Sequence, residues 1–312
     1  MKNLKLFTCL LGIISFVTIL KANGQTPLDG LAQQPHAAYS VRLLKKTYSG
    51  PAIQVRRSSD NQLVDVYFDA SGKLSLKSLV SASGAGTKIN LGAWIDKSSA
   101  FITTWYDQSG NDNHATQKNS AFQPRIINEG IIESLGNGMA SLRMLNGANG
   151  GSGFTLPFTL SGVADLNIFT VLKQEGNLTI GNHIFGTSGP TGKTPGKLQM
   201  MYFLPNIFAV QSAGILKFPV GPAEVYSVRF KITPDADGTA QISAGGKIST
   251  TVTGLLTTPL DSSSPTLYRV GNAAYSRNFE GLSPEFILFN KPVNDLDATK
   301  LVASQHSFFG SK

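Results

Sequence analysis

The chain has 312 residues, and its 27 Lys and Arg residues exceed its 19 Asp and Glu residues to leave a formal net charge of +8. The densest basic segments, Arg42–Lys46 and Arg56–Arg57, are short, and no run of five like charges occurs. Because a nucleic-acid-binding protein needs a broader basic stripe, this distribution argues against a nucleic-acid partner.

Residues 1–24 have the pattern of an export signal. Lys2 and Lys5 precede the uncharged apolar segment Leu6–Leu20, which is short for a membrane span, and small residues follow before Gln25. The only cysteine, Cys9, lies inside the apolar segment rather than at its end, so lipid acylation is not expected. We expect cleavage before Gln25 and a periplasmic, cell-surface or extracellular protein with no membrane span. The remaining 24 basic and 19 acidic residues give about +5.

Strands dominate the predicted elements. Short apolar runs separated by 32 Gly and 15 Pro residues are typical of an all-β sandwich. Composition and alternation predict strands, in chain order, at Ile53–Arg56, Val64–Phe68, Phe101–Tyr106, Asn167–Lys173, Leu198–Phe203, Ile207–Val210, Glu224–Phe230, Ala240–Ser243, Leu267–Val270 and Glu285–Phe289. Tyr226, Val228 and Phe230 share one face, as in a strand with one buried side.

Only a few short helices are expected, at Ala37–Lys46, Leu74–Ser81 and Asn294–Phe308. The last has the strongest signals, because Asn294 can cap its N-terminus and Gly310 can end it. Asp295 and Asp297 also favour the positive end of the helix dipole.

The Gly-rich segment Asn146–Gly153 is typical of either a linker or a long loop. Neither half of the chain alone supplies enough strands for two closed sheets. We therefore predict one β-sandwich domain over residues 25–312.

Several familiar site patterns fail on spacing. The segment Gly186–Thr194 has one residue too many for a phosphate-binding loop. Asp107–Lys118 alternates oxygen-bearing side chains as a calcium loop does, but Gly110 is fourth rather than sixth, and Lys118 stands where Glu belongs. A structural calcium in another geometry stays open. The four histidines are dispersed, so we expect no zinc site, and no cofactor is predicted.

An aromatic strand runs directly into a tight turn at Trp105–Gln117. The strand delivers Trp105, Tyr106 and Asp107 to a loop of Ser, Gly, Asn and Asp that also holds His114. Aromatic faces beside amide, carboxylate and imidazole groups suit a sugar-binding surface, but they also occur in an ordinary β-corner. Trp105 is expected in the core. Tyr106, on the opposite face, and His114 are the better candidates for contact with a sugar.

Two segments together resemble a known family. Tyr39–Asp60 resembles the start of the catalytic domain of arabinofuranosidase B, and Thr103–Gln117, with its Tyr-Asp-Gln-Ser-Gly-Asn-x-Asn-His-x-Thr-Gln pattern, resembles the second hallmark of that family. The match is specific over residues 39–117 and weak beyond. It implies a two-sheet antiparallel jelly-roll or concanavalin-like sandwich with a concave carbohydrate-handling face. It also implies retaining cleavage of terminal α-L-arabinofuranosyl units by two carboxyl groups.

The catalytic positions that the resemblance implies carry no carboxyl group here. The nucleophile position falls on Leu204, and the acid/base position falls on Ala273. Of the implied pocket positions, Asn206 is kept. No Asp or Glu occurs from Asn177 to Pro222, so a shift of the alignment supplies no nucleophile in that stretch.

Other carboxylates could replace the missing catalytic groups only weakly, and the chief candidates are Glu175 and Glu285. Alternation places Glu285 on the face of Ile287 and Phe289, where burial would raise its pKa as a general acid requires. The competing interpretation is an edge-strand or bulge glutamate bonded to backbone groups. Asp107 lies outside the catalytic pair of the family, and we expect its carboxylate to satisfy N–H groups of its own loop.

Two functions follow from this pattern. The first is an exported carbohydrate-interacting sandwich that binds a glycan, for example an arabinose-containing polysaccharide, or has a structural role, with the catalytic carboxylates missing. Its aromatic platforms would be Tyr106, Trp94 and Tyr202, with His114 and Asn206 as polar contacts. The alternative is an active retaining α-L-arabinofuranosidase, acting on arabinose-containing polysaccharide, whose carboxylates have moved to other loops.

Overall fold

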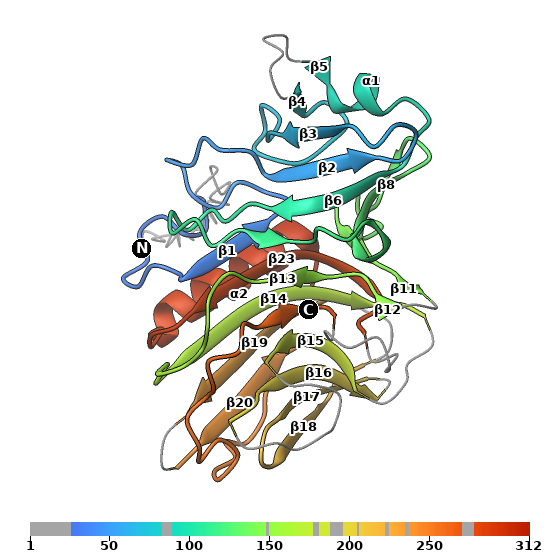
Figure 1. The fold of residues 1–312 in the computed structure, drawn as a ribbon. Coiled ribbons are helices and arrows are strands. Elements are labelled where there is room, and N and C mark those ends of the chain that lie inside the picture. Colours follow the sequence, from blue (N-terminus) through green and yellow to red (C-terminus); the bar gives the residue numbers. More distant parts are fainter. Residues whose placement is uncertain are drawn as a thin grey trace, which may run out of the picture.

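The computed structural model describes residues 26–82, 89–147, 150–176, 181–187, 196–204, 206–221, 225–234, 237–269 and 278–312. Antiparallel strands are the main regular structure of these residues (Figure 1). The strands are β1 (Ala37–Ser40), β2 (Ile53–Arg57), β3 (Leu63–Val66), β4 (Leu79–Ala82), β5 (Ile89–Asn90), β6 (Ala100–Trp105), β7 (Ala115–Thr116), β8 (Arg125–Asn128), β9 (Ile131–Ile132), β10 (Leu142–Met144), β11 (Asn146–Gly147), β12 (Gly150–Gly151), β13 (Phe154–Thr155), β14 (Leu166–Gln174), β15 (Asn182–Gly186), β16 (Gln199–Leu204), β17 (Ile207–Gln211), β18 (Ile215–Pro219), β19 (Val225–Thr233), β20 (Thr239–Ala244), β21 (Lys247–Ile248), β22 (Thr266–Leu267) and β23 (Gly281–Phe289). The helical elements are α1 (Leu91–Ile95), a 3-10 turn at Ser120–Phe122 and α2 (Asp295–Phe309).

Apart from the hairpin β11–β12, the described strands are joined by continuous pairing, within which three sheets can be distinguished. The N-terminal sheet has the order β5–β4–β3–β2–β6. In the helix-side sheet, β23 pairs with β1 and β10 along one edge and with β14 along the other, and the sheet continues through β19 and β20 to β21. The open sheet has the order β7–β13–β22–β15–β16–β17–β18. The last two sheets are the layers of the sandwich (Figure 1).

The two layers separate at β6. One edge of β6 pairs with β2, whereas its other edge pairs with β8 at Ala100 and Phe101 and with β7 at Thr104 and Trp105. The register shifts between Ala100 and Phe101, an irregularity that lets a strand change direction. From there β8 leads through β10 to the helix-side sheet, and β7 leads through β13 to the open sheet.

Large aromatic side chains fill the space between the layers. Tyr39 and Trp105 have ring centroids 5.6 Å apart, Trp105 and Phe154 are 6.0 Å apart, and Phe185 and Phe286 are 5.3 Å apart. All five rings are buried, so each contributes a large apolar area to folding. The core position predicted for Trp105 is confirmed.

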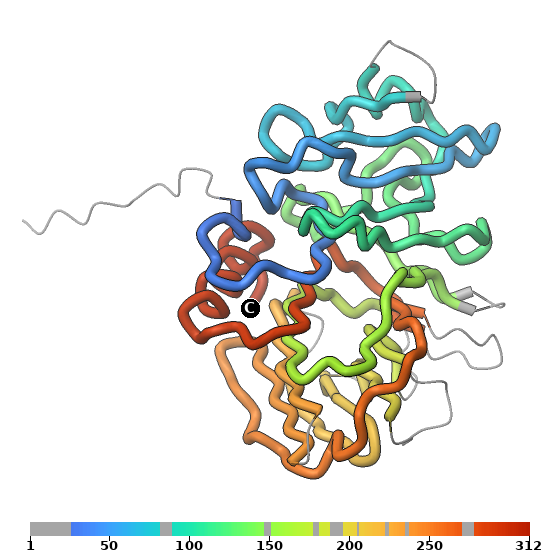
Figure 2. The backbone as a smooth tube through the Cα atoms, turned by 60° about the vertical axis from the view of Figure 1, so that its left-hand side comes forward, coloured from blue at the N-terminus to red at the C-terminus, as the bar shows by residue number. Residues whose placement is uncertain are grey.

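Helix α2 covers the outer face of the helix-side sheet, where Phe169, Ile287 and Phe289 pack with Ala298 and Leu301. The cap signals are confirmed: the Asn294 side chain accepts a hydrogen bond from Asp297 N at 2.8 Å, and Gly310 is left-handed with φ +65°. Figure 2 shows α2, in red, beside the blue N-terminal segment. There the backbone N–H of Ala32 donates to the Asp297 carboxylate at 2.9 Å.

The all-β sandwich is confirmed, but two expected helices are wrong. In place of the helix Ala37–Lys46, residues Ala37–Ser40 form β1, whose backbone groups pair with Glu285–Leu288 of β23. In place of the helix Leu74–Ser81, turns lead into β4, which pairs with β3. Both segments have weak helical patterns. Hydrogen bonds to a neighbouring strand satisfy the backbone N–H and C=O groups that a helix would otherwise pair within the segment.

Candidate carbohydrate site

The loop after β6 is organised by one carboxylate. Asp107 is 2% exposed and accepts hydrogen bonds from the N–H groups of Ala38, Ser109 and Asn113 at 2.8, 2.9 and 3.0 Å, and from Ser109 Oγ at 2.6 Å. Its expected role of satisfying loop N–H groups is therefore confirmed. The same contacts occupy the oxygens that a calcium ion would need.

The next residue connects this loop to the N-terminal segment. Gln108 is fully buried, its Oε1 accepts from Leu44 N at 2.8 Å, and its Nε2 donates to the carbonyl oxygens of Ser40 and Arg42. The Tyr39 hydroxyl donates to the carbonyl oxygen of Asn113. The two segments that carry the family resemblance are therefore bonded to each other, and their shared pattern maintains a scaffold corner.

Tyr106 and His114 are brought together at the rim of this corner. Their rings meet edge to face with centroids 4.9 Å apart, and His114 Nδ1 accepts from Asp107 N at 3.1 Å. The Tyr106 hydroxyl donates to Asp65 Oδ1 at 2.7 Å. Burial, followed by this bond to Asp65, raises the pKa of Tyr106, so its phenol is neutral. Both side chains are partly exposed, and they keep their candidacy for sugar contact.

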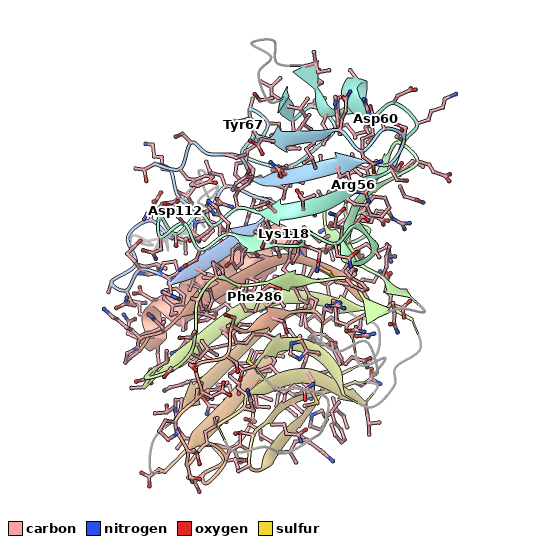
Figure 3. The ribbon with its side chains drawn as sticks, in the orientation of Figure 1. Arg56, Asp60, Tyr67, Asp112, Lys118 and Phe286 are labelled. Carbon is pink, nitrogen blue, oxygen red and sulfur yellow. The ribbon has the colours of Figure 1, made fainter. Side chains whose placement is uncertain are left out.

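A polar groove of about 390 Å³ lies on the outer face of β2, β6 and β7. In β2 alternation builds it, because Val55 points into the core while Gln54 and Arg56 point outward. In β6 a register shift opposite Gln54 and Val55 lets both Thr103 and Thr104 face the groove. Arg56 and Lys118 both line the groove, and Figure 3 labels them beside β2 and β7. Amide, hydroxyl and guanidinium groups of this kind can donate to and accept from sugar hydroxyls.

A chain of hydrogen bonds joins the groove to Tyr106. Asp65 Oδ1, which accepts from Tyr106, also accepts from Gln54 Nε2 at 3.1 Å, and Gln54 Oε1 accepts from Thr103 Oγ1 at 2.9 Å. Arg56 donates through Nε to Gln123 Oε1 at 2.9 Å. The sequence analysis missed this groove, although the alternation of Gln54 and Arg56 with apolar residues is the signal that could have found it.

The expected aromatic platforms Trp94 and Tyr202 are corrected by the structure. Trp94 is 6% exposed in α1, and the Arg57 guanidinium lies 4.6 Å from its ring centroid. Tyr202 is 2% exposed in β16, and its ring centroid lies 4.3 Å from that of Phe208. Both rings pack in the interior, because their neighbours cover the faces that a sugar would need.

The positions that the family resemblance marks lie at the end of β16. Leu204 is the last residue of this strand, and Asn206 follows in the turn to β17 with φ +65°. Its carbonyl oxygen accepts from Val220 N at 2.6 Å. Asn is tolerated in this left-handed conformation better than most residues, which gives Asn206 a backbone role. Ala273 lies outside the described residues.

Glu285 is held in a buried ion pair. It is fully buried in β23, and Arg42 donates to both carboxylate oxygens, at 2.7 and 3.0 Å. Ser40 Oγ and Gln305 Nε2 donate to it at 2.8 and 3.1 Å. The predicted face is confirmed, but the edge position is wrong, because residue 285 pairs with Ser40 on one side and Val171 on the other. The register between β14 and β23 shifts directly after this pair, and the carboxylate bonds to side chains rather than to backbone groups. A carboxylate bonded in this way is unsuited to be a general acid.

Glu175 directly follows the last residue of β14 and lies in a row of alternating charges. Arg143 donates to it at 2.5 Å and Lys173 at 3.0 Å, while Arg143 also donates to Glu133 at 2.7 Å. Burial alone would raise the pKa of Glu175, but these two cations lower it overall. The side chain is therefore ionised at neutral pH, so it is also unsuited to be a general acid.

The structure does not bring the two substitute carboxylates together. Glu285 faces α2 beside Arg42, whereas Glu175 is bonded to Arg143 of β10, and neither of them lines the polar groove. Within the described ranges, no three His, Cys, Asp or Glu side chains lie together as metal ligands would. Neither α-helix of the described chain is long and apolar enough to cross a membrane.

The comparisons with known proteins agree with the resemblance seen in the sequence. Residues 22–154 match the family model described as alpha-L-arabinofuranosidase B, catalytic. A probable alpha-L-arabinofuranosidase B of Aspergillus fumigatus is 37% identical over 82 residues, which are 26% of this chain and 14% of that protein.

Solved arabinofuranosidases share the fold. One in complex with arabinofuranosyl-α-1,2-xylobiose has a TM-score of 0.62 at 16% identity, over 90% of this chain and 65% of that chain. A mutant GH54 α-L-arabinofuranosidase soaked with 4-nitrophenyl α-L-arabinofuranoside has a TM-score of 0.61 at 16% identity, over 86% of this chain and 63% of that chain. This chain thus spans less than two thirds of either solved protein. Residues 22–154 resemble the catalytic domain of arabinofuranosidase B in sequence, and the chain shares its fold with solved arabinofuranosidases.

Proposed function

We propose that this protein is a carbohydrate-binding relative of arabinofuranosidase B that recognises arabinose-containing glycan without cleaving it. One observation carries the proposal: the two carboxylates nearest to a catalytic role, Glu175 and Glu285, are each neutralised by arginine. Retaining hydrolysis requires an ionised nucleophile and a protonated acid about 5–5.5 Å apart, free to reach the sugar. Leu204, at the nucleophile position that the family resemblance implies, cannot form a glycosyl ester.

The polar groove supports recognition without catalysis. Apart from Leu63, the described residues that line it are amides, hydroxyls and cations, with no carboxylate among them. Sugar hydroxyls can replace water on such groups, and Tyr106 and His114 supply ring edges beside it. We place the first glycan contacts on Gln54, Thr104 and Tyr106.

We also propose that the protein is exported and that residues 25–312 form one β-sandwich domain. A buried cluster that draws on strands from β1 to β23 supports the single domain. N-terminal sequencing of protein recovered outside the cytoplasm should begin at Gln25, whereas a retained Met1 in that fraction would contradict the cleavage.

Binding and cleavage can be separated with the purified protein. We expect calorimetric titration with arabinan oligosaccharides to release or absorb heat, and 4-nitrophenyl α-L-arabinofuranoside to yield no nitrophenol above buffer. Thr104→Arg should obstruct the groove and lower the affinity by about tenfold or more, because a long charged side chain would occupy the sugar volume. Thr239→Arg, on an outward position of β20 away from the groove, is the matched control.

The alternative, an active arabinofuranosidase, is favoured by the family match itself. It predicts turnover of the nitrophenyl substrate that is lost in Glu175→Gln or Glu285→Gln while the fold is retained. That result would overturn the proposal. Absence of both heat and turnover would also contradict it and leave a structural role.

A further inference from the structure

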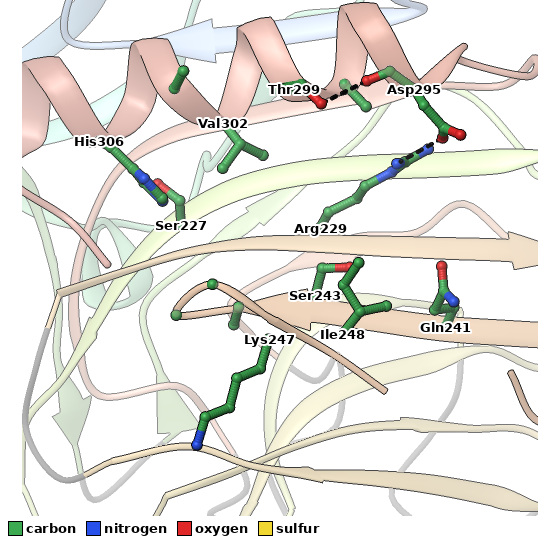
Figure 4. Close-up of a pocket in the computed structure, with 15 residues that line it drawn as sticks. Ser227, Arg229, Gln241, Ser243, Lys247, Ile248, Asp295, Thr299, Val302 and His306 are labelled. Carbon is green, nitrogen blue, oxygen red and sulfur yellow. Dashed lines mark hydrogen bonds and ion pairs between the residues drawn. The ribbon is translucent and has the colours of Figure 1, made fainter. Parts of the chain in front are cut away.

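A cavity of about 640 Å³ lies between α2 and the strands β19, β20 and β21 (Figure 4). Strand alternation creates its floor. Val228 and Ile242 point into the core between the sheets, so Ser227, Arg229, Gln241 and Ser243 point outward into the cavity. This volume is in the range of small-molecule sites.

The helix side of the cavity combines small apolar residues with three polar ones, Asp295, Thr299 and His306. α2 packs on β14 and β19, and its Ala298, Val302 and Ala303 face the cavity without filling it. Ile248 of β21 forms part of the opposite wall and is 67% exposed. A large aliphatic side chain this exposed offers an apolar face to a ligand.

Arg229 is a partly buried cation whose charge is poorly neutralised. Its side chain is 13% exposed, and its ion-pair partner Asp295 lies 3.7 Å away with a side chain that is 96% exposed. Its Nη2 donates to Asn167 Oδ1 at 3.0 Å, but its buried Nε has no partner in the described protein. An anionic ligand in the cavity would give this guanidinium, which lines it, a second counterion and charge-assisted acceptors.

Other polar groups around the cavity complement Arg229. Lys247 lies on the exposed rim, and Figure 4 shows it on the strand side, across the cavity from α2. His306 projects from α2, and its buried Nε2 has no partner among the described residues. Burial lowers the pKa of His306, so the imidazole is neutral at pH 7. Among the described residues that line the cavity, Asp295 is the one acidic side chain. Because it is almost fully exposed, water screens its charge.

We propose that this cavity binds a carboxylate-bearing sugar, such as a uronate unit of an acidic glycan. The carboxylate lies against Arg229, the ring C–H face contacts Ile248 and Val302, and the ring hydroxyls face Gln241 and Ser243. The site is separate from the polar groove of β2, β6 and β7. Its function therefore does not depend on arabinose recognition or on catalysis.

The test is a titration of the full chain with glucuronate, with glucose and butyrate as the two comparison ligands. We expect glucuronate to bind at low salt at least tenfold more tightly than either comparison ligand, because only glucuronate combines the carboxylate with the hydroxylated ring. Its affinity should fall between 20 mM and 500 mM NaCl, whereas binding of a neutral sugar should not change.

Two variants locate the binding. Arg229→Gln removes the cation and should lower glucuronate affinity about tenfold. Since Arg229 also bonds Asn167, Ala303→Trp provides a second test: it fills the cavity from an exposed helix position and should abolish binding. Ser307→Trp, exposed on the same helix but outside the cavity, is its control.

Binding to wild type that is lost in Ala303→Trp and kept in Ser307→Trp supports the site. Glucuronate binding that persists in Ala303→Trp, or that is absent in wild type, overturns it. Equal affinity for butyrate or for glucose overturns the assignment of a carboxylate-bearing sugar.

Discussion

At the scale of single residues, the main lesson concerns Glu285. Its position in an apolar strand predicts a candidate general acid, but the structure surrounds it with a guanidinium, a hydroxyl and an amide. Arg42 approaches from a segment 243 residues away in sequence, and its guanidinium also lies over the rings of Phe308 and Phe309 at 4.7 and 5.1 Å. The site is therefore a structural ion pair that joins β1, β23 and α2.

Replacing Glu285 by Gln should destabilise the protein strongly. Arg42 would remain buried without its counterion, and breaking one side of a buried pair typically costs about 3 kcal/mol or more. Urea unfolding of Glu285→Gln measures this loss, with the exposed Glu129→Gln as a control that should change little. Equal stabilities with loss of nitrophenyl-arabinofuranoside turnover would instead identify Glu285 as a catalytic group.

At the scale of elements, one loop joins the family-like segments. The turn after β6 holds Asp107 and Gln108, which bond the backbone of residues 38–44 and of the turn itself. Loops that satisfy their N–H groups through a buried carboxylate are rigid, because each donor has a charged acceptor. This loop therefore stabilises the meeting of β1 and β6 and presents Tyr106 and His114 at its rim.

Asp107→Asn and Asp112→Asn form a matched pair that tests this role. The first puts an amide N–H group where four donors now find a carboxylate, so we expect a loss of about 2 kcal/mol in the free energy of unfolding. The second changes a side chain that is 93% exposed and should alter stability little. Similar unfolding midpoints for the two variants would show that the carboxylate is not the organising group.

At the scale of the whole molecule, the sandwich depends on strands that are far apart in sequence. The central strand β23 pairs with β1, β10 and β14, and the layers diverge from β6. Aromatic rings from both layers then close one core. His183 of β15 is fully buried in this arrangement, where its Nε2 lies 3.2 Å from the carbonyl oxygen of Thr266.

His183 should make the stability of the protein depend on pH. Burial lowers its pKa from 6.5 to about 4, against the effect of its bond to Thr266. Between these values the unfolded chain binds more protons than the folded protein, so stability falls as the pH falls from 6.5 to 4, by about 3 kcal/mol from this residue.

Urea unfolding from pH 7 to pH 4 measures this slope. His183→Gln should flatten it, whereas Thr266→Val keeps the imidazole and should keep the slope. An unchanged slope in His183→Gln would show that other groups govern the acid sensitivity in this range.

Local patterns predicted much of the fold. The alternation of Tyr226, Val228 and Phe230 identified the buried face of β19, and Asn294 and Gly310 marked the ends of α2. These signals depend only on side-chain period and backbone capping, which neighbours in sequence determine. The helix expected at residues 37–46 was wrong because the backbone of β1 pairs with a strand near the other end of the chain.

The all-β class, the ends of α2 and the resemblance to arabinofuranosidase B could be predicted from residue order, because each of these is a local property of composition, spacing or motif. The surroundings of each candidate side chain depended on how the strands pack together. This packing buried Trp94 and Tyr202, paired Glu285 with Arg42 and Glu175 with Arg143, and assembled a polar groove and a second cavity from outward-facing residues. The physical reason is that burial and ion pairing depend on contacts between strands that are distant in sequence, which no local pattern specifies.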